Sequence, residues 1–296
     1  MRHTIRYSAA VTLFGVAFAM LPPQAIALDA PLTATAQKLV QNFSSAEETL
    51  EYHFMLKMPT FTDDNRDEVF TKMADALKDM VQLGPLKGQK TGSYIDSKDR
   101  ILDKVHLILR LRPGQLTVKA RSTSLNDLMD LKACTGQKIK YEKDFFEEPG
   151  FSISSEYSFK KEEWLADPTK ATVRQTMDFM QEKCPALLAQ LEPYLKPMEA
   201  LAAPGTARMH SADIKLNHPI QDSLKESGFT MWMFPGSKHT LGEIVWTGRV
   251  KDKPALDQLY KDMREKLVKA DLLAPDQSSK TEQYFFAYYG ARTPAK

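Results

Sequence analysis

The chain has 296 residues, of which 43% are hydrophobic and 26% are charged, and its formal net charge is +2. This length allows one large domain or two small ones. A nearly neutral charge balance argues against nucleic acid as a partner and against general binding to membrane surfaces, because both depend on an excess of basic residues.

The first 27 residues predict a secretory signal peptide. Arg2 and Arg6 give it a basic start, residues 9–21 are apolar, and residues 25–27 (Ala-Ile-Ala) have the small-x-small pattern of a cleavage site. The apolar stretch is shorter than the roughly 20 residues that span a bilayer, so cleavage is favoured over an uncleaved anchor. Cleavage would remove both arginines and leave a neutral chain without a stable membrane span, in the periplasm or secreted.

Residues 28–49 are predicted to be an N-terminal lead-in with a short helix near residues 35–41. The first strand is expected over residues 50–58, where mainly polar side chains share one parity and mainly apolar ones share the other. An amphipathic helix is expected over residues 63–83, because apolar residues recur there at helical spacing and Gly84 follows. The next expected elements are a strand over residues 89–95 and a short helix over residues 98–104.

Charged residues keep one parity along two neighbouring strands, residues 107–112 and 116–121. Because side chains alternate between the two faces of a strand, Arg110 and Arg112 share one face, and Lys119 and Arg121 repeat the pattern on the next strand. On a flat sheet these four cations would form only a solvated face. Inside a barrel they would line an anion-binding pore, because arginine and lysine are good donors to phosphate oxygens.

The rest of the chain is predicted to alternate groups of helices with groups of strands. Glu243 and Arg249 share a parity on one of these strands and could close a pore from the opposite side, although ordinary surface charge explains them equally well. Strands grouped in this way favour an antiparallel α+β or barrel arrangement over a parallel sheet. The expected helices cover residues 124–131, 173–180, 186–195 and 256–267, and the expected strands cover residues 138–144, 151–159, 207–216, 229–234, 242–250 and 283–289.

Cys134 and Cys184 are the two cysteines of the chain. In an exported protein an isolated pair favours a disulfide over a metal site, and closing a loop of this length would contribute roughly 4 kcal/mol. Two free, buried thiols are the alternative.

Several segments follow one another in a recognisable order: Tyr94-Ile95-Asp96, then residues 107–112 (Leu-Ile-Leu-Arg-Leu-Arg), then residues 116–119 (Leu-Thr-Val-Lys). A Ser279-Lys280 pair follows the last long helix. This order resembles the CYTH domain of the triphosphate tunnel metalloenzymes, which include class IV adenylate cyclases, thiamine triphosphatases and inorganic tripolyphosphatases. The chain would be a divergent, exported member.

The resemblance implies an antiparallel β-barrel or tunnel of about eight strands with flanking helices, over residues 50–290, with a helical insertion around residues 165–204. Its interior cations would bind a triphosphate, and its carboxylates would hold Mg²⁺ or Mn²⁺. The family's first strand carries glutamate-x-glutamate-x-lysine. Here Glu51 matches the first glutamate, whereas His53 and Met55 stand at the second glutamate and the lysine, and Lys57 could supply the missing cation. This departure predicts degraded catalysis.

Three functions remain open from the sequence: binding of a phosphorylated or polyphosphate anion, metal-dependent triphosphate hydrolysis, and a structural exported domain without a ligand. No catalytic residue is assigned. The candidate metal ligands are Glu51 and Glu243, with Glu142 and Glu156 as additional candidates and Mg²⁺ or Mn²⁺ as the ion. The candidate anion-binding residues are Lys57, Arg110, Arg112, Lys119, Arg121 and Arg249.

Overall fold

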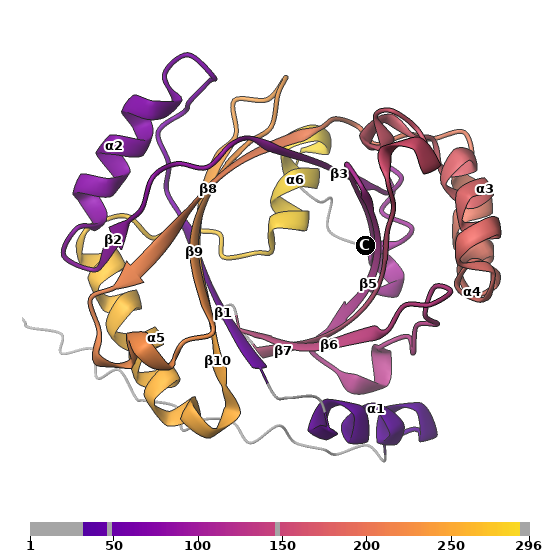
Figure 1. Cartoon of the computed structure of the whole chain (residues 1–296), viewed down its shortest axis with the longest axis horizontal. Helices are drawn as coiled ribbons and strands as arrows, with labels where there is room; N and C mark the ends of the chain where they lie inside the picture. Colours follow the sequence, from indigo (N-terminus) through magenta and orange to yellow (C-terminus); the bar gives the residue numbers. More distant parts are fainter. Residues whose placement is uncertain (1–31, 46–48, 146–148, 291–296) are drawn as a thin grey trace, which may run out of the picture.

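The computed structural model of the chain describes residues 32–45, 49–145 and 149–290 (Figure 1). The predicted signal peptide at residues 1–27 lies outside these ranges. Nine strands pair in a closed ring, which confirms the predicted α+β barrel with flanking helices. Their bounds are β1 (Thr49–Leu56), β3 (Lys90–Ile95), β4 (Leu107–Arg112), β5 (Gln115–Ser122), β6 (Ile139–Phe145), β7 (Pro149–Ser158), β8 (Ala207–Leu216), β9 (Glu226–Met233) and β10 (Thr240–Arg249).

The strand number and one strand direction differ from the expected eight antiparallel strands. Around the ring the order is β8-β3-β4-β5-β7-β6-β1-β10-β9, and β9 pairs back with β8. The β1–β6 pair is parallel, with Leu50 opposite Lys143, and every other neighbouring pair in the ring is antiparallel. Directions cannot alternate all the way round a ring with an odd number of strands, so nine strands require at least one parallel pair.

The outward faces of β4, β5 and β7 carry the leucine-rich parity of their sequences. They pack against α1 (Ala34–Ser45), α3 (Val173–Lys183) and α4 (Pro185–Leu195) in one buried cluster, in which Leu109 and Val118 join Met180 and Leu187. Burial of these apolar side chains is the main stabilising contribution on this side of the barrel. Since strand side chains alternate, the charged parity of the same strands faces the barrel interior.

On the other side, β1, β9 and β10 turn their apolar parity outward against α2 (Arg66–Leu77) and α5 (Lys253–Lys269) (Figure 1). Phe54 stacks on Tyr260 with ring centroids 4.5 Å apart, and Trp246 is fully buried nearby. Glu51, His53 and Glu243 therefore point inward. None of the helices in the described ranges combines the length and the apolar composition that a bilayer span requires.

A disulfide joins Cys134 and Cys184. Cys134 lies in the segment that leads into β6, and Cys184 lies at the junction between α3 and α4. Both residues are buried in the same cluster as the outward leucines of β4. The bridge therefore fastens the α3–α4 pair to the barrel wall.

The last expected strand, residues 283–289, is instead a helix, α6 (Lys280–Tyr289), which lies inside the ring (Figure 1). Ser279 and Glu282 form a capping box that starts the helix. The aromatic residues of this segment have high strand propensity, but helical spacing places Tyr284 and Phe285 together against the inner wall, where Tyr284 contacts Tyr94 with ring centroids 5.0 Å apart. Tertiary packing overrides local propensity here, and α6 fills one part of the barrel.

Three other expected elements are shorter than predicted. The helix expected over residues 63–83 ends at Leu77, and Val81–Leu83 forms a short strand, β2, beside residues 214–216 of β8. This edge of β8 is available because β3 pairs only with residues 207–209. The helices expected over residues 98–104 and 124–131 are single 3₁₀ turns, Asp103–Val105 and Leu125–Asp127.

Gly248 lies where β10 meets α5, and we expect Gly248→Ala to destabilise the protein by about 1–3 kcal/mol. An added Cβ would lie 2.6 Å from both methyl carbons of the buried Leu256. Gly228→Ala is the matched control, because a Cβ there would lie 3.8 Å from its nearest neighbours. Urea denaturation of both variants measures the difference. Equal stability of the two variants would contradict the close packing of β10 on α5.

Candidate functional site

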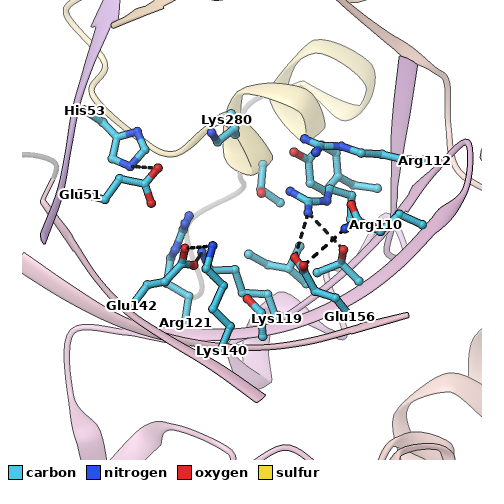
Figure 2. Close-up of a pocket in the computed structure, with 16 residues that line it drawn as sticks. Glu51, His53, Arg110, Arg112, Lys119, Arg121, Lys140, Glu142, Glu156 and Lys280 are labelled. Atoms are coloured by element: carbon cyan, nitrogen blue, oxygen red, sulfur yellow. Dashed lines mark hydrogen bonds and ion pairs between the residues drawn. The ribbon is translucent and has the colours of Figure 1, made fainter. Parts of the chain in front are cut away.

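A cavity of about 350 Å³ occupies the part of the barrel interior that α6 does not fill (Figure 2). Its charged lining comprises six cations and three carboxylates. The cations are Arg110, Arg112, Lys119, Arg121, Lys140 and Lys280, and the carboxylates are Glu51, Glu142 and Glu156.

The structure brings four of the six predicted anion-binding residues to this cavity. Arg110 and Arg112 of β4 and Lys119 and Arg121 of β5 point into it from adjacent strands (Figure 2). The register explains the grouping, because Ile108 lies opposite Lys119 and Arg110 lies opposite Thr117, so the inward side chains of both strands share one patch of wall.

Lys119 and Lys140 hold the carboxylate of Glu142 between them. The Lys119 Nζ–Glu142 Oε2 distance is 2.9 Å and the Lys140 Nζ–Glu142 Oε1 distance is 2.6 Å. Burial alone would raise the pKa of Glu142, but the two lysine charges outweigh it and lower that pKa to about 2. The Glu142 carboxylate is therefore ionised and paired, and it neutralises part of the positive charge of the six cations that line the cavity.

Arg110 and Arg112 have different surroundings although they share a strand face. Arg110 Nη2 donates to Thr117 Oγ1 at 3.1 Å and lies 3.5 Å from Glu156 Oε1. Arg112 has no ion pair in the described ranges, and its buried Nε has no hydrogen-bond partner there. Burial, together with the neighbouring Arg110 charge, lowers the pKa of the Arg112 guanidinium. Arg112 is thus a partly desolvated cation with unused donors at the cavity.

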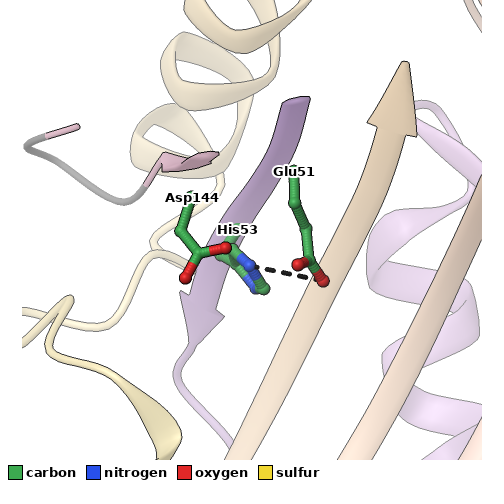
Figure 3. A group of neighbouring side chains, drawn as sticks. All are labelled: Glu51, His53 and Asp144. Atoms are coloured by element: carbon green, nitrogen blue, oxygen red, sulfur yellow. Dashed lines mark ion pairs between the residues drawn. The ribbon is translucent and has the colours of Figure 1, made fainter. Parts of the chain in front are cut away.

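Glu51, His53 and Asp144 form a group that could hold a metal ion (Figure 3). One ligand atom from each residue lies within 4.8 Å of the others, and β1 and β6, which run parallel side by side, supply them. His53 and Asp144 are each 1% exposed. Asp144 Oδ2 accepts from Arg121 Nη2 at 2.9 Å, whereas Asp144 Oδ1 is buried without a hydrogen-bond partner in the described ranges.

This donor set fits a divalent cation. Two carboxylates and an imidazole are common metal ligands, and a buried carboxylate oxygen without a partner is a costly arrangement that a cation would relieve. Burial would raise the pKa of Glu51, but the hydrogen bond and charge of His53 and the charge of Lys280 lower it to about 2, so Glu51 is ionised.

Glu243, the other expected metal ligand, is not a member of this group. Its Oε1 lies 2.9 Å from His53 Nδ1 and 3.0 Å from Lys280 Nζ, and its Oε2 accepts from Trp232 Nε1 at 3.3 Å. Burial opposes its charge, but Lys280 and His53 hold the pKa of Glu243 well below its usual range. Glu243 therefore orients His53 and Lys280 from behind the cavity wall.

Lys57 and Arg249 do not line the cavity. Lys57 follows the last residue of β1 and forms an ion pair with Asp271, and Arg249 is an exposed residue at the end of β10. The parity argument that selected them is valid only while a strand continues along the barrel wall. Both positions lie where that wall ends.

Three charged residues of the site were not selected from the sequence: Lys140, Asp144 and Lys280. Lys140 and Asp144 share the inward parity of β6, so the alternation along residues 139–145 could have identified both as inward-facing. Lys280 belongs to the Ser279-Lys280 pair that supported the family resemblance, but its position inside the barrel depends on α6, which was expected to be a strand.

No protein-family model matches the chain, and no curated protein matches it. Among solved structures, a "putative adenylyl cyclase" from Hippeastrum, described as revealing a dominant triphosphatase activity, is 12% identical; the match covers 82% of this chain and 97% of that one, with a TM-score of 0.44. Two further solved structures, both described as putative adenylate cyclases, also resemble this chain. The one from Bacillus halodurans is 12% identical over 79% of this chain and 98% of that one, with a TM-score of 0.37. The one from Vibrio parahaemolyticus is 11% identical over 79% and 96%, with a TM-score of 0.34. Because all three TM-scores are below 0.5, the function of the chain has to be argued from its own side chains.

Proposed function

We propose that this chain is an exported CYTH-like tunnel protein that binds a phosphorylated or polyphosphate anion inside its barrel, with degraded catalysis. The observation that carries the proposal is the set of six cations that faces one partly open cavity with three carboxylates, while Asp144 and Glu243 pair with Arg121 and Lys280 behind its lining. Like charges held together in a partly desolvated space raise the free energy of the protein, and an anion with several charged oxygens lowers it.

Two further features support this ligand class. A volume of about 350 Å³ lies within the range of small-molecule sites, roughly 300–1,000 Å³. Arg112 offers a guanidinium that is not committed to any ion pair in the described ranges, and arginine binds phosphate oxygens with a planar pair of donors.

Export to the periplasm or the cell exterior belongs to the same proposal. It is supported by the signal-peptide pattern of residues 1–27 and by the Cys134–Cys184 bridge, because disulfides persist mainly in oxidising compartments. A ligand of the full-length protein would then be an extracytoplasmic anion.

Isothermal titration with tripolyphosphate tests the proposal. We expect saturable binding in a buffer that contains a metal chelator, because the six cations supply the attraction, and weaker binding of orthophosphate, which can contact fewer of them. The affinity should fall as salt is added. If tripolyphosphate binds neither in chelator nor with a divalent ion, the proposal is overturned and a structural domain without a ligand is favoured.

Metal-dependent hydrolysis of a triphosphate is a second candidate function, which the Glu51–His53–Asp144 group favours. A bound divalent cation would neutralise phosphate oxygens and polarise the phosphorus–oxygen bond. The chain's own cations would orient the phosphates, and Arg110 and Arg112 would stabilise charge on the terminal group. Phosphate release in the presence of Mn²⁺ that disappears in Glu51→Gln, but persists in the exposed control Glu226→Gln, would establish this activity; no release in the wild type would exclude it.

A further inference from the structure

The imidazole of His53 is held in one orientation by a carboxylate behind it. His53 Nδ1 lies 2.9 Å from Glu243 Oε1, and both side chains are buried. The carboxylate of Glu243 also accepts from Trp232 Nε1 and lies 3.0 Å from Lys280 Nζ, so it acts as an acceptor toward His53 and Nδ1 carries the proton in this contact. Nε2 is therefore the atom on the side of Glu51, whose Oε1 is 3.5 Å away.

The same imidazole lies between two carboxylates of the metal group (Figure 3). A carboxylate bonded to one imidazole nitrogen, with a metal on the other, is the usual way in which proteins fix a histidine ligand and raise its basicity. Here Glu243 is the carboxylate on one nitrogen of His53, and Glu51 and Asp144 lie on the side where the metal would bind. Trp232 Nε1 and Lys280 Nζ fix the carboxylate of Glu243 in turn.

We infer that His53 makes this centre selective for first-row transition ions that accept nitrogen ligands, such as Mn²⁺, Co²⁺ and Zn²⁺, over Mg²⁺, with Glu243 as the positioning residue. The inference rests on the metal group of the proposed function. Mg²⁺ prefers an octahedron of oxygen ligands and gives up water reluctantly, whereas imidazole suits the transition ions. Asp144 contributes a single oxygen, because Arg121 and Lys119 occupy its Oδ2.

Mn²⁺ added to the full chain without any phosphate tests the inference directly. Electron paramagnetic resonance follows the loss of the free-ion signal, and spin-echo modulation reports a ¹⁴N nucleus bonded to the ion. We expect one bound Mn²⁺ with ¹⁴N modulation, displaced by equimolar Zn²⁺ and little affected by a large excess of Mg²⁺. Mn²⁺ without ¹⁴N modulation, displacement by Mg²⁺ as effective as displacement by Zn²⁺, or no bound ion would overturn the inference.

The variant His53→Glu restores an all-oxygen group and should lose the ¹⁴N modulation while its preference moves toward Mg²⁺. His218→Glu, the same change outside the barrel, should leave both properties of the wild type unchanged. Glu243→Gln should weaken Mn²⁺ binding roughly tenfold or more while the ¹⁴N modulation remains. The measurements on the wild type keep the test valid if a variant fails to fold.

Titration of the same preparations with tripolyphosphate in chelator separates the two ideas. Anion binding that persists while Mn²⁺ shows no nitrogen ligand would overturn the metal selectivity and leave the proposed function standing. If Mn²⁺ binds with a nitrogen ligand but tripolyphosphate does not bind, the proposed anion binding is overturned and the metal selectivity stands.

Discussion

Arg112→Gln is expected to weaken tripolyphosphate binding by roughly 10- to 100-fold. A hydrogen bond to a charged group contributes about 1.5–3 kcal/mol, and each 1.4 kcal/mol changes the Kd about tenfold. Arg112 should reach the upper part of this range, because none of its donors is committed to an ion pair in the described ranges and its Nε is buried at the cavity. Isothermal titration in chelator measures the change.

The stability of the same variant distinguishes lost binding from lost structure. Burial and the neighbouring Arg110 charge both disfavour a charged Arg112 in the empty protein, so its replacement should leave the free energy of unfolding unchanged or raise it. Arg249→Gln is the matched control, since Arg249 is an exposed arginine on another strand of the same barrel. An unchanged Kd for Arg112→Gln, or an equal loss in both variants, would show that the anion does not bind at this wall.

Replacing both Cys134 and Cys184 by serine is expected to lower the free energy of unfolding by about 4 kcal/mol. The bridge closes a loop with a sequence separation of 50, and the chain entropy that such a loop removes from the unfolded state corresponds to about that energy. The effect should be largest for α3 and α4, because the bridge fastens their junction to the segment before β6. Urea denaturation with and without a reductant provides the measurement.

Hydrogen exchange resolves where that stability is lost. Amides of α3 and α4 should lose protection in the double serine variant, while amides of β9 and β10, on the opposite side of the ring, should keep most of theirs. If the wild type in reductant unfolds at the same urea concentration as in oxidising buffer, the bridge contributes nothing to stability and the expected role is wrong.

The sequence predicted four of the six cations that line the cavity, because the alternation that places them on one face is a local property of each strand. A two-residue period fixes which side chains share a face, and a leucine-rich parity opposite Arg110 and Arg112 identifies the face that packs against helices. The same rule misplaced Lys57 and Arg249, since alternation predicts a face but not the residue at which a strand leaves the barrel.

The metal group required contacts that no local pattern contains. Glu51 and His53 are neighbours on β1, but Asp144 joins them only because β6 lies parallel to β1. Glu243 meets His53 across 190 residues of chain. The sequence therefore suggested that carboxylates and histidine were available, and the ring order decided which of them became partners.

Side-chain alternation and helix-forming patterns are properties of short segments, so the sequence by itself determined the strand faces, most helices and the grouping of Arg110, Arg112, Lys119 and Arg121 on one face. The number of strands, the parallel β1–β6 pair and the position of α6 inside the barrel depend on closure of the whole ring. Closure is a long-range packing event in which burial of Tyr284 and Phe285 outweighs the strand propensity of their segment. Only the tertiary structure could decide it.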